Sequence, residues 1–133
     1  MVNCALEKKA KRFIHTSYIA VYGFQTGTID ETTLSTAMKS EINYFKTKYL
    51  AEIIVKKAIA EKGLDAIILN PCHLMGTYDQ YNWVQLIQSV NQDNLPGIPP
   101  ATGLFCHVEE VAKAHISAFE KGITGENYIL AGG

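Results

Sequence analysis

Tyr44 and Lys48 are the residues of this 133-residue chain whose types and spacing most directly predict chemistry. Two residues four positions apart on a helix lie on the same face, about one turn from each other. An ammonium group beside a phenol stabilises the phenolate, so we expect the pKa of Tyr44 to fall from about 10 toward neutrality. Such a tyrosine can pass a proton to or from a substrate hydroxyl or carbonyl. The alternative is structural, because tyrosine rings often pack over lysine stems in helices without a catalytic role.

The elements that must position this pair are predicted to be a strand, a helix and a second strand. Residues 12–17 are rich in β-branched and aromatic side chains, which predicts a buried strand followed by a turn or short helix, and the Gly/Thr-rich stretch 24–36 predicts a loop. Apolar residues recur at helical spacing over 37–62, and Gly63 is expected to cap this helix. The apolar run 64–71 is typical of a parallel strand covered on both faces. Together these elements predict a βαβ unit with a right-handed crossover.

The second half of the chain alternates in the same way. Residues 82–92 predict a helix, and the stretch 94–103 contains the prolines and glycines that break regular structure. Residues 104–122 predict a short strand that leads into an amphipathic helix, and 126–133 predict a last strand. The fold class is therefore α/β.

Composition and charge exclude several classes of protein. Hydrophobic residues make up 47% and charged residues 19%, as in an ordinary soluble domain. A net charge of −1 gives no electrostatic footprint for a nucleic acid or an anionic membrane surface as partner. The sequence contains neither a run that could span a bilayer nor a signal-peptide pattern. Cys4, Cys72 and Cys106 form no CxxC motif, which predicts reduced cysteines in a cytoplasmic protein and no metal site.

Four segments carry a resemblance to a known family. "KRFIHTSYIAVYG", "YFKTK", "GLDAIILNPCHLMGTYD" and "FCHVEEVAKAH" follow one another with the order and spacing of the extended short-chain dehydrogenase/reductase family. The similarity is to its NAD-dependent epimerase/dehydratase and dihydroflavonol-reductase-like group, and it covers nearly the whole chain. It implies a partial Rossmann-like parallel sheet, the later βαβ half, with part of a small substrate-binding subdomain. Residues 1–76 would be the second half of a dinucleotide-binding domain and 77–133 a partial substrate-binding region, within one compact unit.

The resemblance also implies roles for individual residues. Tyr44 matches the catalytic acid/base, and Lys48 matches the partner that, with Tyr44, holds the nicotinamide ribose of NAD or NADP. Pro71 and Cys72 belong to a segment whose backbone lies along the cofactor in such enzymes. His73 would face the substrate pocket, and its alternative is a hydrogen-bonded histidine of a loop. The implied reaction is reduction or epimerisation of a small carbonyl, alcohol or nucleotide-sugar substrate.

Two positions leave alternatives open. Family members carry a serine or threonine that hydrogen-bonds the reacting oxygen, and this position aligns with Tyr18. Neighbouring Thr16 and Ser17 could replace it only if the strand ends early, because successive strand residues point to opposite faces. Either Ser17 turns inward, or Tyr18 supplies the hydroxyl, or the contact is lost. His107 matches a residue near the substrate cleft, although a helix-capping role suits it better.

The glycine-rich turn that binds a dinucleotide pyrophosphate is absent from this sequence. No GxGxxG lies between a strand and a helix, and in the family that half precedes the segment matched here. We therefore expect an exposed edge on the strand at 12–17. The alternative function is a truncated, catalytically inactive fragment that self-associates as a homo-oligomer or binds a missing N-terminal partner segment.

Overall fold

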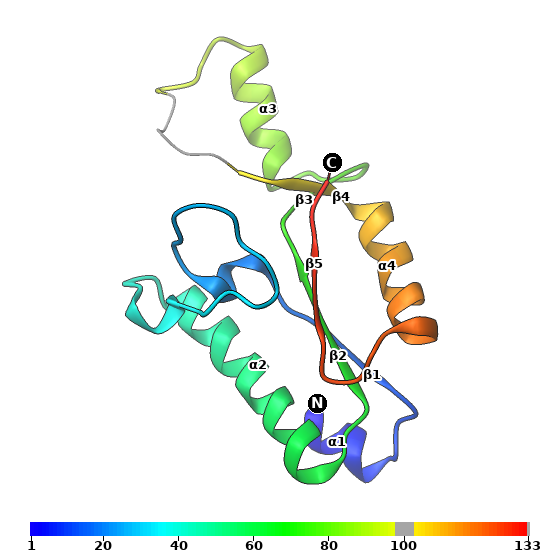
Figure 1. The fold of residues 1–133 in the computed structure, drawn as a ribbon. Helices are drawn as coiled ribbons and strands as arrows, with labels where there is room; N and C mark the ends of the chain where they lie inside the picture. The colour runs from blue at the N-terminus through cyan, green and yellow to red at the C-terminus, as the bar shows by residue number, and fades with distance from the viewer. Residues whose placement is uncertain (98–102, 133) are drawn as a thin grey trace.

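Three parallel strands form the main sheet of the protein (Figure 1). The computed structural model describes residues 1–97 and 103–132. The strand order is β1-β2-β5, and both neighbouring pairs are parallel. Their bounds are Phe13–Thr16 for β1, Ala66–Pro71 for β2 and Asn127–Leu130 for β5. Strand β5 therefore pairs in the same sheet as β1 and β2, although it lies in the second of the two predicted regions, residues 77–133.

Helices cover both faces of the central strand β2, as Figure 1 shows. Ala66 and Ile68 of β2 pack with Val55 and Ala58 of the long helix α2 (Asn43–Lys62). The alternate residues Ile67 and Leu69 pack with Ala118 of α4 (Val108–Lys121) on the other face. All six residues of β2 are buried, which confirms the predicted two-sided parallel strand.

A smaller parallel pair lies beyond the end of β2. Strand β3 (His73–Met75) pairs with β4 (Phe105–His107), and β3 leads toward α3 (Trp83–Asn91). The short helix α1 (Val2–Glu7) contacts α2 near the other end of the molecule. The parallel strands thus end where β3 and α3 begin, and this is the edge at which α/β sheets bind ligands.

The long helix starts later than the sequence pattern predicts. A helix was expected over 37–62, but α2 begins at Asn43, and Ala37–Lys39 forms only a separate 3₁₀ turn. The Thr36 N–H donates to the Tyr22 carbonyl at 2.9 Å, and Ser40 adopts an extended backbone (φ −71°, ψ 144°). These contacts hold the segment against the turn after β1, so the helix cannot extend backward. Its end agrees with prediction, because Gly63 takes the left-handed conformation (φ 65°).

The other elements match their predicted positions to within about three residues, but β3 was not predicted. The predicted breaker stretch 94–103 lies partly outside the described residues. Within the described residues, no helix has both the length and the apolar character needed to cross a membrane.

Candidate active site

A cavity of about 320 Å³ lies at the carboxyl ends of β1 and β2. Its walls come from the end of β1 and the following loop, from α2, from the end of β2, from β3 and from the start of α3. Three of these elements, β1, α2 and β2, are brought together by the parallel sheet and its crossover helix. The described lining residues are Thr16, Ser17, Tyr18, Tyr44, Lys48, Pro71, His73, Leu74, Asn82 and Trp83.

Tyr44 and Lys48 both line this cavity from the first turns of α2. The Lys48 Nζ lies over the Tyr44 ring, 5.7 Å from its centroid. The expected fall in the pKa of Tyr44 is wrong for this arrangement, because partial burial raises that pKa above the usual value of 10. The phenol is therefore protonated at neutral pH, and it can donate a proton to a developing alkoxide.

Ser17 and Tyr18 occupy different environments at the end of β1. The strand ends at Thr16, and Ser17 is buried, with its N–H donating to the Leu69 carbonyl at 2.8 Å. Among the described residues, the Ser17 Oγ has no hydrogen-bond partner. The Tyr18 hydroxyl instead hydrogen-bonds the Nδ1 of His73, and its ring packs edge-on against Tyr44 with centroids 5.8 Å apart. The Ser17 hydroxyl is thus buried without a partner among the described residues, whereas the Tyr18 hydroxyl is already engaged.

His73 lies at the centre of an aromatic wall. Its ring centroid is 4.6 Å from that of Trp83 and 5.4 Å from that of Phe105, and the last two rings meet edge to face at 4.9 Å. Burial lowers the pKa of His73, which favours the neutral imidazole. His73, the first residue of β3, is therefore hydrogen-bonded to Tyr18 and also lines the cavity.

Pro71 and Cys72 diverge at the end of β2. Pro71 lines the cavity, while the Cys72 side chain is buried against Cys106 and Val111 in the core. Burial raises the pKa of the Cys72 thiol, so it is protonated and inert. The structure therefore brings six of the seven predicted site residues to one cavity and leaves the Cys72 side chain outside it.

The other histidines have structural contacts. The Nδ1 of His107 accepts a hydrogen bond from the Glu109 N–H at 3.3 Å, which confirms the predicted helix-capping role. His115 lies 2.8 Å from the Thr16 hydroxyl and 2.7 Å from the Val111 carbonyl. Within residues 1–97 and 103–132, no group of three or more His, Cys, Asp or Glu side chains could hold a metal ion.

Sequence reasoning missed the walls that Asn82 and Trp83 provide. The signal available was Asp79, whose carboxylate accepts N–H groups of Asn82 and Val84 and so fixes the start of α3. Aspartate ahead of an apolar helix is a common N-terminal signal. Its consequence for the cavity was not visible, because it depends on β3 turning α3 toward α2.

Comparisons with known proteins agree with this fold. A model of the NAD dependent epimerase/dehydratase family matches residues 1–131. A cinnamoyl-CoA reductase from Medicago truncatula is 27% identical over 96% of this chain and 43% of that protein. The crystal structure of gox2253 is 34% identical, with a TM-score of 0.91 over 99% of this chain and 41% of that one. DesIV, a dTDP-glucose 4,6-dehydratase from Streptomyces venezuelae solved with NAD bound, has the same fold at 20% identity (TM-score 0.85, 99% of this chain and 42% of that one).

The lengths differ between this chain and its relatives. The chain spans about 43% of the curated reductase and 41% of the gox2253 chain. Each match therefore covers less than half of the relative's own length.

Proposed function

Because the chain belongs to the NAD dependent epimerase/dehydratase family, we propose that its cavity is the catalytic half of an NAD(P)-dependent reductase or epimerase site. The observation that carries this proposal is the convergence of Tyr44, Lys48 and Ser17 on one cavity. These residues come from two separate elements, and their side-chain chemistry is that needed to move a proton to or from a substrate oxygen. The site residues that fit a bound nicotinamide are Tyr44, Lys48 and Pro71, together with the backbone at Cys72.

Each residue has a distinct role in this proposal. Tyr44 donates a proton to the carbonyl oxygen in the reducing direction, which is the state its raised pKa favours at pH 7. The Ser17 hydroxyl donates a hydrogen bond to the same oxygen, since it is buried at the cavity without another partner among the described residues. The Lys48 ammonium lies over the Tyr44 ring, and its positive charge would stabilise the phenolate that remains after proton transfer. NAD(P)H, when bound, supplies the hydride that completes reduction of the carbonyl carbon.

The lining favours a small aromatic carbonyl compound as the substrate. Aromatic or imidazole rings form much of the wall: Tyr18, Tyr44, His73 and Trp83. Lys48 is the one lysine or arginine among the described lining residues, whereas a nucleotide-sugar diphosphate calls for more positive charge. The similarity to a cinnamoyl-CoA reductase supports the same choice over a nucleotide sugar. The Trp83 and His73 rings would stack on a planar substrate.

Tyr44→Phe tests the proposed reaction. NADPH- or NADH-dependent reduction of an aromatic aldehyde such as cinnamaldehyde is measured from the loss of cofactor absorbance, with UDP-glucose epimerisation measured in parallel. Because the proton donor is removed while the ring remains, we expect kcat to fall about 10²- to 10⁴-fold with little change in stability. Tyr78→Phe is the matched control, since Tyr78 is 92% exposed and does not line the cavity. Equal rates for Tyr44→Phe and Tyr78→Phe would exclude Tyr44 as the acid.

A second candidate function is a catalytically inactive chain that self-associates or binds a partner segment. It is favoured by the lack of a glycine-rich phosphate turn in this sequence and by the position of β1 at the edge of the described sheet. A cavity of about 510 Å³ with apolar walls, including Phe13, Ile54 and Val55, opens along that edge. Titration with NADH and NADPH separates the two candidates: saturation at micromolar cofactor supports the enzyme, and no saturation up to millimolar cofactor supports the inactive chain.

A further inference from the structure

A buried carboxylate lies directly behind the cavity. Glu52 is 3% exposed, and its Oε1 accepts a hydrogen bond from Asn70 Nδ2 at 2.5 Å. Its Oε2 accepts one from Asn127 Nδ2 at 3.1 Å, and the same Nδ2 also donates to Asn70 Oδ1 at 2.8 Å. The Lys56 Nζ lies 3.8 Å from Oε2. The three side chains thus close a triangle between α2, β2 and β5.

The position of this triangle connects it to the α2 wall and to the Tyr18–His73 wall of the cavity. Tyr44, Lys48 and Glu52 follow one another at four-residue intervals along α2, so they share one face of the helix. Asn70 directly precedes Pro71, a lining residue, and its Nδ2 also lies 3.5 Å from the Tyr18 carbonyl. Tyr18 in turn holds His73 through its hydroxyl. One buried amide therefore contacts the helix that carries Tyr44 and the loop that carries Tyr18.

Burying a carboxylate costs free energy that an apolar residue would avoid, even when hydrogen bonds compensate for it. Apolar packing would also leave the helix free to slide or rotate along the sheet, whereas hydrogen bonds fix direction and distance. The triangle contains no group that touches the cavity directly. Its contribution must therefore act through the residues that it holds.

We propose that Glu52, with Asn70 and Asn127, is a positioning network that sets the Tyr44–Lys48 wall of the cavity against the Tyr18–His73 wall. The inference rests on the proposed function, because that function gives the relative position of the two walls its catalytic role. The position of the walls can still be measured without turnover. Removing the carboxylate shifts the helix face and loosens the Tyr18 loop together, because the same Asn70 amide binds both.

Trp83 provides the measurement. It is the single tryptophan of the chain, and its ring centroid is 4.6 Å from that of His73, so protonation of the imidazole quenches its emission. The pH at the midpoint of this quenching, measured between pH 5 and 8, reports the surroundings of His73. The Tyr18 hydroxyl contacts His73 directly, and Tyr44 and Lys48 line the same cavity. Tyrosine and lysine side chains with ordinary pKa values of about 10 do not change charge between pH 5 and 8. The variant His73→Gln, which should abolish the transition, assigns it to this residue.

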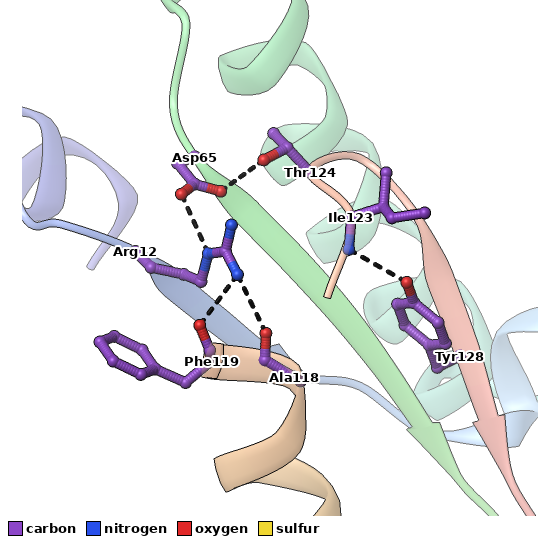
Figure 2. Close-up of polar contacts among 7 residues, drawn as sticks. All are labelled: Arg12, Asp65, Ala118, Phe119, Ile123, Thr124 and Tyr128. Atoms are coloured by element: carbon purple, nitrogen blue, oxygen red, sulfur yellow. Dashed lines mark hydrogen bonds and ion pairs between the residues drawn. The ribbon is translucent and has the colours of Figure 1, made fainter. Parts of the chain in front are cut away.

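Glu52→Gln is the test variant, and Asp65→Asn is its matched control. Figure 2 shows that Asp65 also joins several elements, since it accepts from Arg12 Nε at 2.9 Å and from Thr124 Oγ1 at 2.5 Å, but at the opposite end of the sheet. Both changes replace a hydrogen-bonded carboxylate with an amide. We expect Glu52→Gln to move the midpoint by about 0.5 unit toward the ordinary histidine value, and Asp65→Asn to leave it unchanged while the melting temperature falls in both.

An unmoved midpoint in Glu52→Gln, or an equal shift in Asp65→Asn, would overturn the proposal. If Glu52→Gln does not fold, Asn127→Ala, which leaves the Glu52–Asn70 hydrogen bond in place, should still shift the midpoint, and no shift would count against the network.

Reduction of cinnamaldehyde with NADPH is measured on the same preparations. A midpoint that shifts in Glu52→Gln but not in Asp65→Asn, together with a wild-type chain that shows no turnover, would contradict the proposed function and leave the network supported. Turnover that is unaffected by Glu52→Gln, with an unmoved midpoint, would support the function and overturn the network. The two ideas therefore fail separately.

Discussion

At the scale of single residues, the cavity separates two hydroxyl groups that the sequence alone could not rank. Ser17 is buried with its Oγ unpartnered among the described residues, while the Tyr18 hydroxyl binds His73. A hydroxyl with no internal partner is available to stabilise charge on a substrate oxygen, and one such donor is worth about 10²- to 10³-fold in kcat. We therefore propose that Ser17 makes the oxygen contact and that Tyr18 forms a structural part of the wall.

Ser17→Ala and Tyr18→Phe test this assignment. We expect Ser17→Ala to lower kcat for aldehyde reduction about 10²-fold with KM nearly unchanged, because the contact strengthens as charge develops on the oxygen. Tyr18→Phe should lower kcat by less than about 10-fold, since it removes only the hydrogen bond to His73. Steady-state kinetics on both variants decide the point. The larger loss in Tyr18→Phe would transfer the role to that residue.

At the scale of elements, local pattern predicted the parts whose stability is local. The apolar run of β2 and the glycine at position 63 gave a buried strand and a capped helix end, as the structure shows. The helix start was wrong because Thr36 is held by Tyr22, fourteen residues earlier in the chain. Strand β3 was missed because its partner β4 lies about thirty residues later, and three residues carry too little pattern of their own.

The same reasoning explains the two errors in the site. Spacing placed Tyr44 and Lys48 on one helix face, which the cavity lining shows, but the pKa of Tyr44 depends on burial that spacing does not reveal. Glu52 reads in sequence as one more charge on a polar helix face. Its burial depends on Asn70 and Asn127, which lie 18 and 75 residues away in the chain.

Arg12 joins the elements at the end of the sheet away from the cavity (Figure 2). Its Nε donates to Asp65, and its Nη1 donates to the Ala118 and Phe119 carbonyls at 3.2 and 2.9 Å, at the carboxyl end of α4. Arg12→Met keeps most of the apolar stem but removes these charge-assisted hydrogen bonds. We expect the free energy of unfolding to fall by about 1–2 kcal/mol, measured by urea denaturation.

Lys113→Met is the control for Arg12→Met. Lys113 and Glu110 form an ion pair whose side chains are both about two-thirds exposed, so its loss should leave the free energy of unfolding nearly unchanged. A loss in Lys113→Met as large as that in Arg12→Met would mean that the fold responds to net charge rather than to the contacts of Arg12.

Asp65 adds a pH dependence to this junction. Its pKa is lowered mainly by the hydrogen bond from Thr124 and further by Arg12. A carboxyl group with a lowered folded-state pKa stabilises the fold above its unfolded value of 3.8, and this contribution is lost as the pH falls through the folded-state pKa. Thr124→Val should therefore flatten the acid side of the stability curve below pH 4 more than Arg12→Met does. If the stability of Thr124→Val and that of the wild type fell equally steeply below pH 4, this ranking would be contradicted.

At the scale of the whole molecule, the sheet and α2 leave an apolar surface beside the edge strand. Strand β1 is an edge strand of the sheet, whose order is β1-β2-β5. Residues of β1 and α2 line the cavity of about 510 Å³ along this edge. Ile54 projects from α2 at this cavity and is 59% exposed. An unpaired strand edge next to exposed isoleucine favours association, either with a second copy of the chain or with a segment that adds to the sheet.

Ile54→Lys tests this association. We expect the purified chain to have a solution mass of at least twice its 14.7 kDa by light scattering, and we expect the variant to move toward one chain because a desolvated ammonium opposes burial of the surface. Lys57→Ile provides the converse control, since Lys57 lies on an exposed face of the same helix and does not line this cavity. A wild-type chain that is monomeric at all concentrations would exclude self-association through β1. The inactive-chain candidate would then require a separate partner segment, whereas the cofactor titration would still decide whether the cavity works as an enzyme site.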